Sequence, residues 1–456
     1  MDWTAARRWY SAPVRIVRPA SDGMQGGQGM DASPPSESPR LVALERALAS
    51  GDGTSLDAFW RAVARDGTPL IELIPDDPDQ ALVTFLWRAT TPLARAAVFP
   101  LSQVLGTEIA EHRMARLGDT DVWYTTCRVR RDFRGAYRLS PDDPLTSLRE
   151  VTSPAGWRAR TAMWCPDPLN PRRFVVPDDE ERPEQPGFQA SVLALPGAPP
   201  QPWIDARPGV PAGAVTLHRF RSRILGNERR LWVYTPPGYA ATGAPYGLLV
   251  LFDGWSYTQL VPTPTILDNL IAAGRIPPLV ALLPDNPDQA ARTRELPCHE
   301  PFVASLADEL LPWAHRRYHL TTDPTKTIAA GASYGGLAAA FVGLRRPDLF
   351  GNVLSQSGSF RWAPPGDPEH EWLARQYAAR PTGPLRFYLD VGALELGPRD
   401  AGPNQVVANR HLRDVLRARD YDLHYAEYAG GHEYLCWQGT LADGLLALLQ
   451  RPPISA

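Results

Sequence analysis

The chain has 456 residues, which is long for a single domain, so we expect two domains. Hydrophobic residues make up 44% of the chain, enough for sizeable cores, and the formal net charge of −3 lacks the basic excess on which bulk nucleic-acid binding depends. The four cysteines are scattered without a Cys-x-x-Cys pair, so the sequence predicts reduced thiols and neither a disulfide framework nor a zinc site.

The beginning of the chain, residues 1–38, is rich in Gly, Ser, Pro and Met, a composition that cannot bury a core. We therefore predict a disordered leader there. The N-terminus contains no continuous apolar segment of the kind that a secretion signal needs, and no stretch of the chain approaches the length of a membrane span. The sequence accordingly predicts a soluble, cytoplasmic protein that does not engage a membrane.

Residues 39–205 are predicted to form a first, all-β domain with a proline-rich connector. Apolar spacing typical of helices comes first, followed by short runs rich in Val, Ile, Phe, Trp and Tyr with turn residues between them. This rhythm is typical of an antiparallel sandwich. The helices are expected at 41–50 and 56–67, and the strands at 69–75, 81–89, 94–101, 122–129 and 135–141. The proline-dense stretch 165–187 and the prolines between 196 and 211 predict an irregular connector.

Residues 206–456 alternate between apolar runs and helical patterns. This alternation predicts a doubly wound α/β sheet with parallel strands and helical crossovers. A helix is expected over 301–318. The strands are expected at 229–236, 246–254, 278–284, 325–331, 351–358, 385–392 and 423–431.

The most informative segment of the second domain is the stretch TIAAGASYGGLAAA, residues 327–340. An apolar run enters a Gly-x-Ser-x-Gly turn at Ser333, and a small-residue helical pattern leaves it. This arrangement is that of the nucleophile elbow of α/β-hydrolases, in which a tight strand-to-helix turn holds a serine hydroxyl above the sheet. Glycines at 331, 335 and 336 suit the turn because a Cβ there would clash with the neighbouring strand and helix. Ser333 is thus predicted to be the nucleophile of an esterase or a close relative.

A serine hydroxyl needs a base to take its proton, and in α/β-hydrolases that base follows the nucleophile and the acid along the chain. Four histidines come after Ser333. His432 follows a predicted strand in the segment AGGHE, where two glycines let a loop fold back over the sheet. His424 lies within a strand pattern and His411 within a charged helix, so we predict His432 as the base.

The acid is expected on the loop after the strand at 385–392, where a carboxylate would orient the imidazole and stabilise its cation. Asp390 lies inside the strand pattern and can instead hydrogen-bond the backbone, and Asp400 lies in a Gly- and Pro-rich loop where solvent can surround it. Position along the chain favours Glu395. The choice among these three carboxylates stays open at this point, and a weak or absent acid is also compatible with the sequence.

An oxyanion hole needs backbone N–H groups aimed at the developing alkoxide. One is expected from Tyr334, directly after the nucleophile. The second is expected from Trp255, in the loop Asp253-Gly254-Trp255, where the glycine permits close backbone approach. An ordinary turn at the end of a strand is the alternative interpretation of this loop.

Several blocks of the sequence resemble the enterochelin (enterobactin) esterase family. In the second domain these blocks are Leu251–Trp255, Arg292–Cys298, Gly331–Gly336, Leu354–Ser359 and Gly430–Glu433 with the pair Cys436 and Trp437. In the first domain they are Phe85–Arg88, Gly118–Trp123 and Asp167–Pro171. The similarity extends from about residue 65 to about residue 450. The combination of RELPC, LSQSGS and GGH-x-x-x-CW is much more specific than the elbow alone.

This resemblance implies a serine hydrolase that cuts the ester backbone of a cyclic trilactone catecholate siderophore, ferric or iron-free, so that iron can be released. It implies an immunoglobulin-like first domain that helps to enclose the substrate. Ser333 would be the nucleophile, His432 the base and Glu395 the acid. Neither a cofactor nor a protein metal site is implied, because the iron arrives inside its chelator.

A ferric tris-catecholate is bulky, aromatic and anionic, so a site for it should present arginines and aromatic faces. Side chains of this kind flank the blocks that carry the resemblance. Those predicted to contact the substrate are Arg292, Arg294, Arg361, Trp362 and Trp437. The structural alternatives are an ion pair between Arg294 and Glu295 and a core position for Trp437.

Two other functions fit part of the same pattern. A general esterase-D-like carboxylesterase or an acyltransferase would share the elbow, His432 and the oxyanion hole. A protein that binds ferric siderophores without hydrolysing them would need a broken triad, which the pairing of Ser333 with His432 speaks against. The oligomeric state is left open by the sequence.

Overall fold

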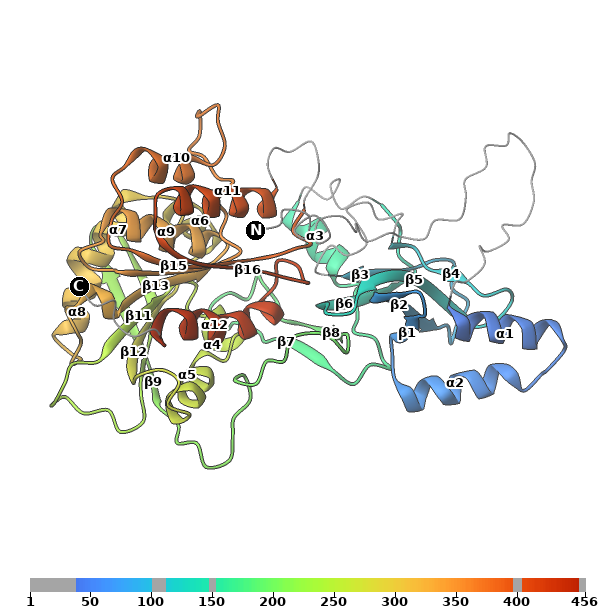
Figure 1. The fold of residues 1–456 in the computed structure, drawn as a ribbon. Helices are drawn as coiled ribbons and strands as arrows, with labels where there is room; N and C mark the ends of the chain where they lie inside the picture. The colour runs from blue at the N-terminus through green and yellow to red at the C-terminus, as the bar shows by residue number, and fades with distance from the viewer. Residues whose placement is uncertain (1–37, 101–111, 147–152, 397–403, 451–456) are drawn as a thin grey trace. The chain divides into compact units, whose positions relative to one another are not determined.

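The structure is a computed structural model that describes residues 38–100, 112–146, 153–396 and 404–450 (Figure 1). Its contacts divide the chain into two compact units. The first unit runs to Val175 and takes in Gly187–Pro199, whereas Val176–Pro186 and the chain from Pro200 onward belong to the second unit. The chain therefore passes between the units more than once in the proline-rich segment, where the sequence predicts a single boundary after residue 205.

Two helices open the first unit, α1 (Pro39–Ala49) and α2 (Ser55–Asp66), where the apolar spacing predicts them. Ser38 belongs to the predicted leader, but it is buried and caps α1: the Leu41 N–H donates to its Oγ at 3.4 Å. The rest of the leader lies outside the described residues. Both helices share one core with the sheet beside them. The buried members of that core are Leu41, Leu44, Trp60, Val63, Leu70, Leu86, Leu117, Val122 and Tyr124.

The strands of the first unit form two four-stranded sheets with antiparallel pairing. One sheet has the order β1 (Leu70–Ile74), β2 (Asp77–Arg88), β5 (Val122–Arg130) and β4 (Ala115–Arg116). The other has the order β3 (Ala96–Pro100), β6 (Arg134–Pro141), β8 (Phe188–Ala194) and β7 (Arg173–Val176), and a short helix, α3 (Pro154–Thr161), lies between β6 and β7 in the chain. Phe85 of β2 and Tyr137 of β6 meet edge to face with 4.8 Å between ring centroids, so the sheets pack against each other.

The prediction of an irregular connector is wrong in part, because β7 lies within the proline-dense stretch 165–187 and β8 lies between that stretch and the prolines at 196–211. Prolines flank β8 at 186 and 196 and do not interrupt it, so its backbone N–H groups remain available to the sheet. Ala190 and Leu193 bury their side chains in the sandwich.

The second unit is built on one eight-stranded sheet with the order β16-β15-β14-β13-β11-β12-β10-β9. The strands are β9 (Ala214–Ser222), β10 (Asn227–Thr235), β11 (Gly247–Leu251), β12 (Leu279–Pro284), β13 (Thr327–Ala332), β14 (Asn352–Gln356), β15 (Arg386–Gly392) and β16 (Asp422–Tyr428). Pairing is parallel from β12 to β16 and antiparallel where β10 meets β12 and β9. The predicted doubly wound α/β sheet is confirmed, with an antiparallel hairpin added at one edge.

Helices cover both faces of this sheet (Figure 1). In chain order they are α4 (Ser256–Gln259), α5 (Thr263–Ala272), α6 (Gln289–Glu295), α7 (Glu300–Ser305), α8 (Leu311–His315), α9 (Tyr334–Arg345), α10 (Trp372–Ala379), α11 (Gln405–Ala418) and α12 (Tyr434–Leu449). A π-helical turn, Leu306–Leu310, joins α7 to α8, so the helix predicted over 301–318 is continuous only to His315 and is not uniformly α-helical.

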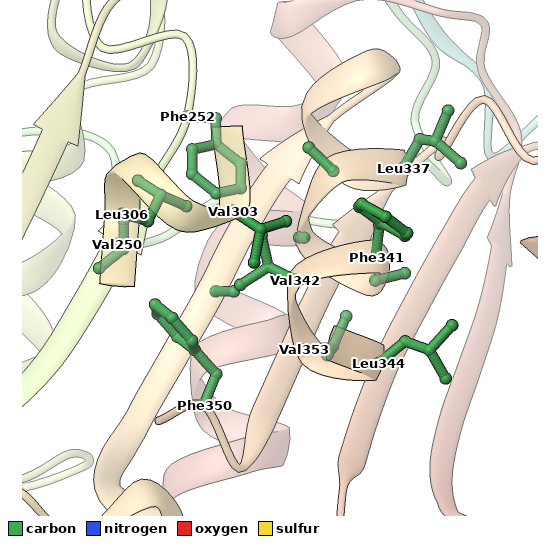
Figure 2. Close-up of a cluster of buried hydrophobic side chains, with 14 of the residues drawn as sticks. Val250, Phe252, Val303, Leu306, Leu337, Phe341, Val342, Leu344, Phe350 and Val353 are labelled. Carbon is green, nitrogen blue, oxygen red and sulfur yellow. The ribbon is translucent and has the colours of Figure 1, made fainter. Parts of the chain in front are cut away.

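Helix α9 is buried along nearly its whole length, and every residue from Gly335 to Leu344 is small or apolar and buried. Figure 2 shows its apolar side chains among those of neighbouring elements, including Val250 of β11, Val353 of β14 and Val303 of α7. A helix that is apolar all round belongs in a core. This packing holds the N-terminus of α9, and with it the elbow, rigidly at the end of β13.

Candidate active site

Ser333 occupies a strained turn between β13 and α9. Its backbone has φ 57° and ψ −121°, a conformation that side chains rarely adopt. A Cβ added to Gly331 would lie 2.6 Å from the carbonyl carbon of Gly335, so the crossing of strand and helix requires glycine. The Ser333 N–H donates to the Gln356 carbonyl at 3.0 Å, which ties the turn to β14. These are the features of a nucleophile elbow.

The Ser333 hydroxyl shares a hydrogen bond with another serine: Ser333 Oγ and Ser359 Oγ lie 3.2 Å apart. Tyr334, the next residue, is the first of α9, so its N–H belongs to the N-terminal turn that has no acceptor within the helix. Such an N–H, with the positive end of the helix dipole behind it, suits a developing oxyanion.

His432 is paired with a buried carboxylate. Its Nδ1 lies 2.6 Å from Oε2 of Glu395, whose side chain is only 3% exposed, while the histidine side chain is 41% exposed. Of the other two candidate acids, Asp390 accepts the Ser357 N–H at 3.3 Å, and burial raises its pKa to about 8. Asp400 lies outside the described residues. Among the described candidates, Glu395 is therefore the carboxylate that orients His432.

The topology brings the loops of Ser333, Glu395 and His432 to one edge of the sheet although these residues are far apart in sequence. They follow β13, β15 and β16 respectively, which run parallel to one another within one part of the sheet. Loops at the carboxyl ends of parallel strands share one edge of a sheet, which is where α/β proteins place their sites.

The remaining histidines after Ser333 have other partners or positions. His411 pairs with Glu371 at 2.8 Å, and His424 stacks on the ring of Tyr388 with 5.3 Å between centroids. His370 is exposed. His424 lies in β16, as its strand pattern predicts, and His411 lies in α11, as its helical pattern predicts, and both side chains are exposed.

Glu395 is held by neutral donors. Its Oε1 accepts the Ser357 hydroxyl at 2.6 Å and the Gly392 N–H at 2.9 Å, which leaves Oε2 for the histidine. The Trp437 indole N–H in turn donates to Ser357 Oγ at 3.1 Å. We call Ser357, Glu395, Tyr428, His432 and Trp437 the acid-side network; Tyr428 joins it through its hydroxyl, 3.2 Å from Ser357 Oγ.

The prediction that Trp437 contacts the substrate is wrong. Its side chain is buried, and its ring packs edge to face against His432 at 4.8 Å between centroids, so it supports the histidine from within the protein. Sequence reasoning also missed Ser357 as a site residue. The available signal was its place in the LSQSGS block, at the end of the strand that separates the nucleophile strand from the acid strand.

Arg292 is committed to a structural ion pair. Its Nε and Nη2 contact the two carboxylate oxygens of Asp253 at 2.7 and 2.8 Å, a bidentate geometry. Asn286 Nδ2 also donates to Asp253, at 2.8 Å. Asp253 follows β11 with φ 60°, so this pair fixes the loop predicted to form part of the oxyanion hole. The structure thus gives Arg292 a role in holding that loop, and its contact with a substrate stays a prediction.

The neighbouring carboxylate Asp285 receives the N–H of Trp255, with 3.3 Å between N and Oδ1. In this structure the Trp255 N–H is directed at a carboxylate, so its role as the second oxyanion donor stays a prediction. Asp285 is also bound by two arginines, Arg230 at 2.9 Å and Arg182 from the segment Val176–Pro186. Such a buried carboxylate needs these partners to remain in a protein interior.

Arg230 completes this set of charges. Both of its terminal nitrogens contact Asp179, at 2.7 and 2.6 Å, and this contact lowers the pKa of Asp179. Arg182 donates to the Asn286 carbonyl at 2.7 Å, which links these ion pairs to the Asp253 pair. We call the six charged residues the arginine cluster. Its members are Asp179, Arg182, Arg230, Asp253, Asp285 and Arg292.

The other predicted substrate contacts lie in different surroundings. The side chain of Arg294 is 59% exposed and pairs with the buried Glu295 at 2.8 Å, as the structural alternative predicts. Arg361 is exposed, and its guanidinium has no hydrogen-bonding partner among the residues that the structure describes. Trp362 is half-buried and packs edge to face on Trp372 at 6.1 Å between centroids. Contact of these three side chains with a substrate stays a prediction.

Within the described ranges, no group of three or more His, Cys, Asp or Glu side chains is arranged to hold a metal ion. The four cysteines are free thiols, and burial raises the pKa of the Cys127 thiol to about 12. No helix among the described residues is both long and apolar enough to cross a membrane.

The mostly parallel sheet, the elbow at Ser333 and the chain order of Ser333, Glu395 and His432 define the class of α/β-hydrolase folds. The sequence matches two family models: Enterochelin esterase, N-terminal, over residues 82–204, and Putative esterase, over residues 222–448. The chain belongs to the enterobactin (enterochelin) esterase family.

Relatives match nearly the whole chain. The iron(III) enterobactin esterase of Dickeya dadantii is 34% identical over 88% of this chain and 95% of its own. The iron(III) salmochelin esterase of Escherichia coli O6:H1 is 31% identical over 90% of this chain and 97% of its own. The crystal structure of the Shigella flexneri enterobactin esterase in the presence of enterobactin matches with a TM-score of 0.68 and 30% identity, over 86% of this chain and 97% of that one.

Proposed function

We propose that this protein is a serine esterase that hydrolyses the trilactone backbone of a catecholate siderophore, in its ferric or iron-free form, and so releases iron. The observation that carries the proposal is the hydrogen bond between the buried Glu395 and His432, which lies at the same edge of the sheet as the strained Ser333. The chain also shares its family with iron(III) enterobactin and salmochelin esterases. A cytoplasmic location is part of the same proposal.

The chemistry follows from these residues. Ser333 Oγ attacks a lactone carbonyl while His432 accepts the hydroxyl proton, and Glu395 stabilises the resulting imidazolium. The Tyr334 N–H stabilises the tetrahedral oxyanion. When the intermediate collapses, the C–O bond of the ester breaks and the leaving alkoxide takes the proton from His432. Water, deprotonated by the same histidine, then hydrolyses the acyl-enzyme to a carboxylic acid and free Ser333.

Substrate recognition in this proposal rests on Arg361. Its exposed guanidinium is uncommitted among the described residues, and it follows by two positions the serine that contacts Ser333 Oγ. Arginine suits an anionic catecholate because its planar head both donates hydrogen bonds and stacks on rings. Trp362, directly after it, adds an aromatic face. Arg292 supports the proposal only indirectly, by holding the loop at Asp253.

The test is to incubate the purified full-length chain with ferric and iron-free catecholate trilactones and to follow the products by mass spectrometry. The expected result is a linear trimer and then shorter products, each hydrolysed ester adding the mass of one water. Ser333→Ala should abolish turnover, and Ser50→Ala, which removes an exposed hydroxyl at the end of α1, should leave it unchanged.

Other outcomes would replace the proposal. Intact trilactone together with rapid hydrolysis or transfer of short acyl groups would identify a general esterase-D-like carboxylesterase or acyltransferase. Tight binding without turnover, unchanged in Ser333→Ala, would identify a binding protein.

In a second experiment, Arg361→Ala should raise KM for the anionic trilactone about tenfold with little change in kcat, the pattern of lost ground-state binding. Arg316→Ala, at an exposed arginine that follows α8, is the matched control.

A further inference from the structure

The loop Ser357-Gly358-Ser359 follows β14, the strand that lies between the nucleophile strand β13 and the acid strand β15 in the sheet. Its position brings it to the same edge as both loops. Each of its serines has a hydroxyl contact to a different member of the proposed catalytic set.

Ser357 contacts the acid. Its hydroxyl donates to Glu395 Oε1 at 2.6 Å while its oxygen accepts the Trp437 indole N–H at 3.1 Å. With the Gly392 N–H on the same Oε1 at 2.9 Å, one carboxylate oxygen is saturated and the other, Oε2, is left to face His432. The direction of the Glu395 carboxylate is therefore set by the Ser357 hydroxyl and one backbone N–H.

Ser359 contacts the nucleophile. Its Oγ lies 3.2 Å from Ser333 Oγ, and its N–H donates to the Ser333 carbonyl at 3.0 Å. These two contacts hold both the backbone of the elbow and the orientation of the reacting hydroxyl. Because Ser359 touches the reacting oxygen itself, its influence on attack is direct, whereas Ser357 acts through Glu395.

The loop is built so that its serines cannot turn freely. Ser357 has φ 47°, and its N–H donates to the Asp390 carbonyl at 2.8 Å. A Cβ added to Gly358 would lie 2.4 Å from Ser355 Oγ and 2.5 Å from the Phe360 ring, so a larger residue does not fit. The Gly358 carbonyl accepts from Asn409 of α11 at 2.9 Å. A strained backbone held from two sides is a mark of a functional position.

Building on the proposed esterase function, we propose that this single loop sets both ends of the catalytic arrangement: Ser357 is a positioning residue for Glu395, and Ser359 is a further catalytic residue that orients the Ser333 hydroxyl for attack. Rigid placement of reacting groups is worth large rate factors, because a misplacement of about 1 Å can cost about 10²-fold. Partners that orient metal ligands from behind contribute about 10- to 100-fold, and we expect an effect of the same order for a serine that orients a catalytic carboxylate.

The first measurement is steady-state kinetics of Ser357→Ala and Ser359→Ala on the ferric trilactone. Ser357→Ala should lower kcat about 10- to 100-fold, and Ser359→Ala about 3- to 10-fold, both with KM within about twofold of the wild type. Ser305→Ala removes another buried hydroxyl, which donates to its own helix at 2.8 Å, and should leave kcat unchanged. Ser359→Thr keeps the hydroxyl and should restore most of the rate.

The second measurement does not depend on turnover. The proton on His432 Nδ1, hydrogen-bonded to Glu395, should give a downfield proton NMR signal, assigned by its loss in His432→Gln. That signal should weaken or move upfield in Ser357→Ala and persist in Ser359→Ala. An unchanged signal and an unchanged kcat in Ser357→Ala would overturn the role of Ser357, and an unchanged kcat in Ser359→Ala would overturn that of Ser359.

The two measurements separate failure of this inference from failure of the proposed function. If the wild type leaves trilactones intact but cleaves an aryl acetate, the same variants are compared on that ester, and the predicted kcat losses still decide the inference. Should Ser357→Ala not fold, as judged by its circular dichroism and melting curve, Ser357→Cys, which keeps the volume but weakens the donor, takes its place with the same expected direction.

Discussion

The acid-side network and the arginine cluster lie on opposite sides of the nucleophile strand in the sheet order, and they stabilise buried carboxylates in different ways. In the arginine cluster, guanidinium groups cover the carboxylates of Asp179, Asp253 and Asp285. In the acid-side network, Glu395 receives a hydroxyl, a backbone N–H and a histidine, and no arginine among the described residues pairs with it.

The carboxylates of the two regions have different roles, and their partners fit those roles. A guanidinium neutralises a carboxylate and occupies its lone pairs in a fixed, bidentate geometry, which suits a loop that has to stay in place. A carboxylate that must stabilise an imidazolium needs its charge and one free oxygen. Neutral donors such as the Ser357 hydroxyl leave Glu395 with both. Variants that disturb the acid-side network should therefore lose activity, and variants that disturb the arginine cluster should lose stability.

The largest expected effect is that of Glu395→Gln. The amide nitrogen would donate where the carboxylate accepts, so His432 would be held in the wrong tautomer, and kcat should fall about 10³- to 10⁴-fold. The melting temperature should change little by comparison. Steady-state kinetics and thermal unfolding check both statements, with Glu300→Gln, at an exposed surface pair, as control. A kcat within tenfold of the wild type would mean that Glu395 is not the acid.

Arg230→Ala should break the arginine cluster and cost stability more than rate. The change leaves Asp179 and Asp285 buried with fewer partners, and loss of one partner of a buried pair costs about 3–5 kcal/mol of unfolding free energy. Urea unfolding measures this. Arg219→Ala removes an exposed pair with Glu181 and should lower the unfolding free energy far less, because exposed ion pairs contribute little. Equal losses in the two variants would contradict the distinction between the buried and the exposed pair.

Asp390→Asn should have the smallest effect on kcat and a clear effect on the pH dependence of stability. Burial raises the pKa of Asp390 from 3.8 to about 8, so between these values the folded chain holds a proton that the unfolded chain has released. The contribution to unfolding free energy is thus present below about pH 4 and declines as the pH rises towards about 8. Urea unfolding across this pH range should show the decline in unfolding free energy for the wild type and a flatter pH profile for the variant. Identical pH profiles would contradict a raised pKa of Asp390 in the folded chain.

Much of the architecture could be predicted from periodicity and spacing. The strand runs of both units, the elbow at Ser333 and the loop at His432 all appear where local pattern places them, because period, turn glycines and chain order are properties of short segments. The strands β7 and β8 escaped prediction because proline density was taken as a sign of irregular chain, although the prolines only flank β8.

The fold class, the family and the order of serine and histidine along the chain follow from the amino-acid sequence, since each depends on local pattern or on blocks of similar residues. The folded chain was needed to show that Glu395 and not Asp390 meets His432 and that Trp437 packs against the histidine ring. It was also needed to show that Arg292 pairs with Asp253, that the Trp255 N–H donates to Asp285, and that Ser357 holds the acid. The physical reason is that these contacts join loops from separate strands, and their partners are set by the order of strands in the sheet and by which buried charges must be paired.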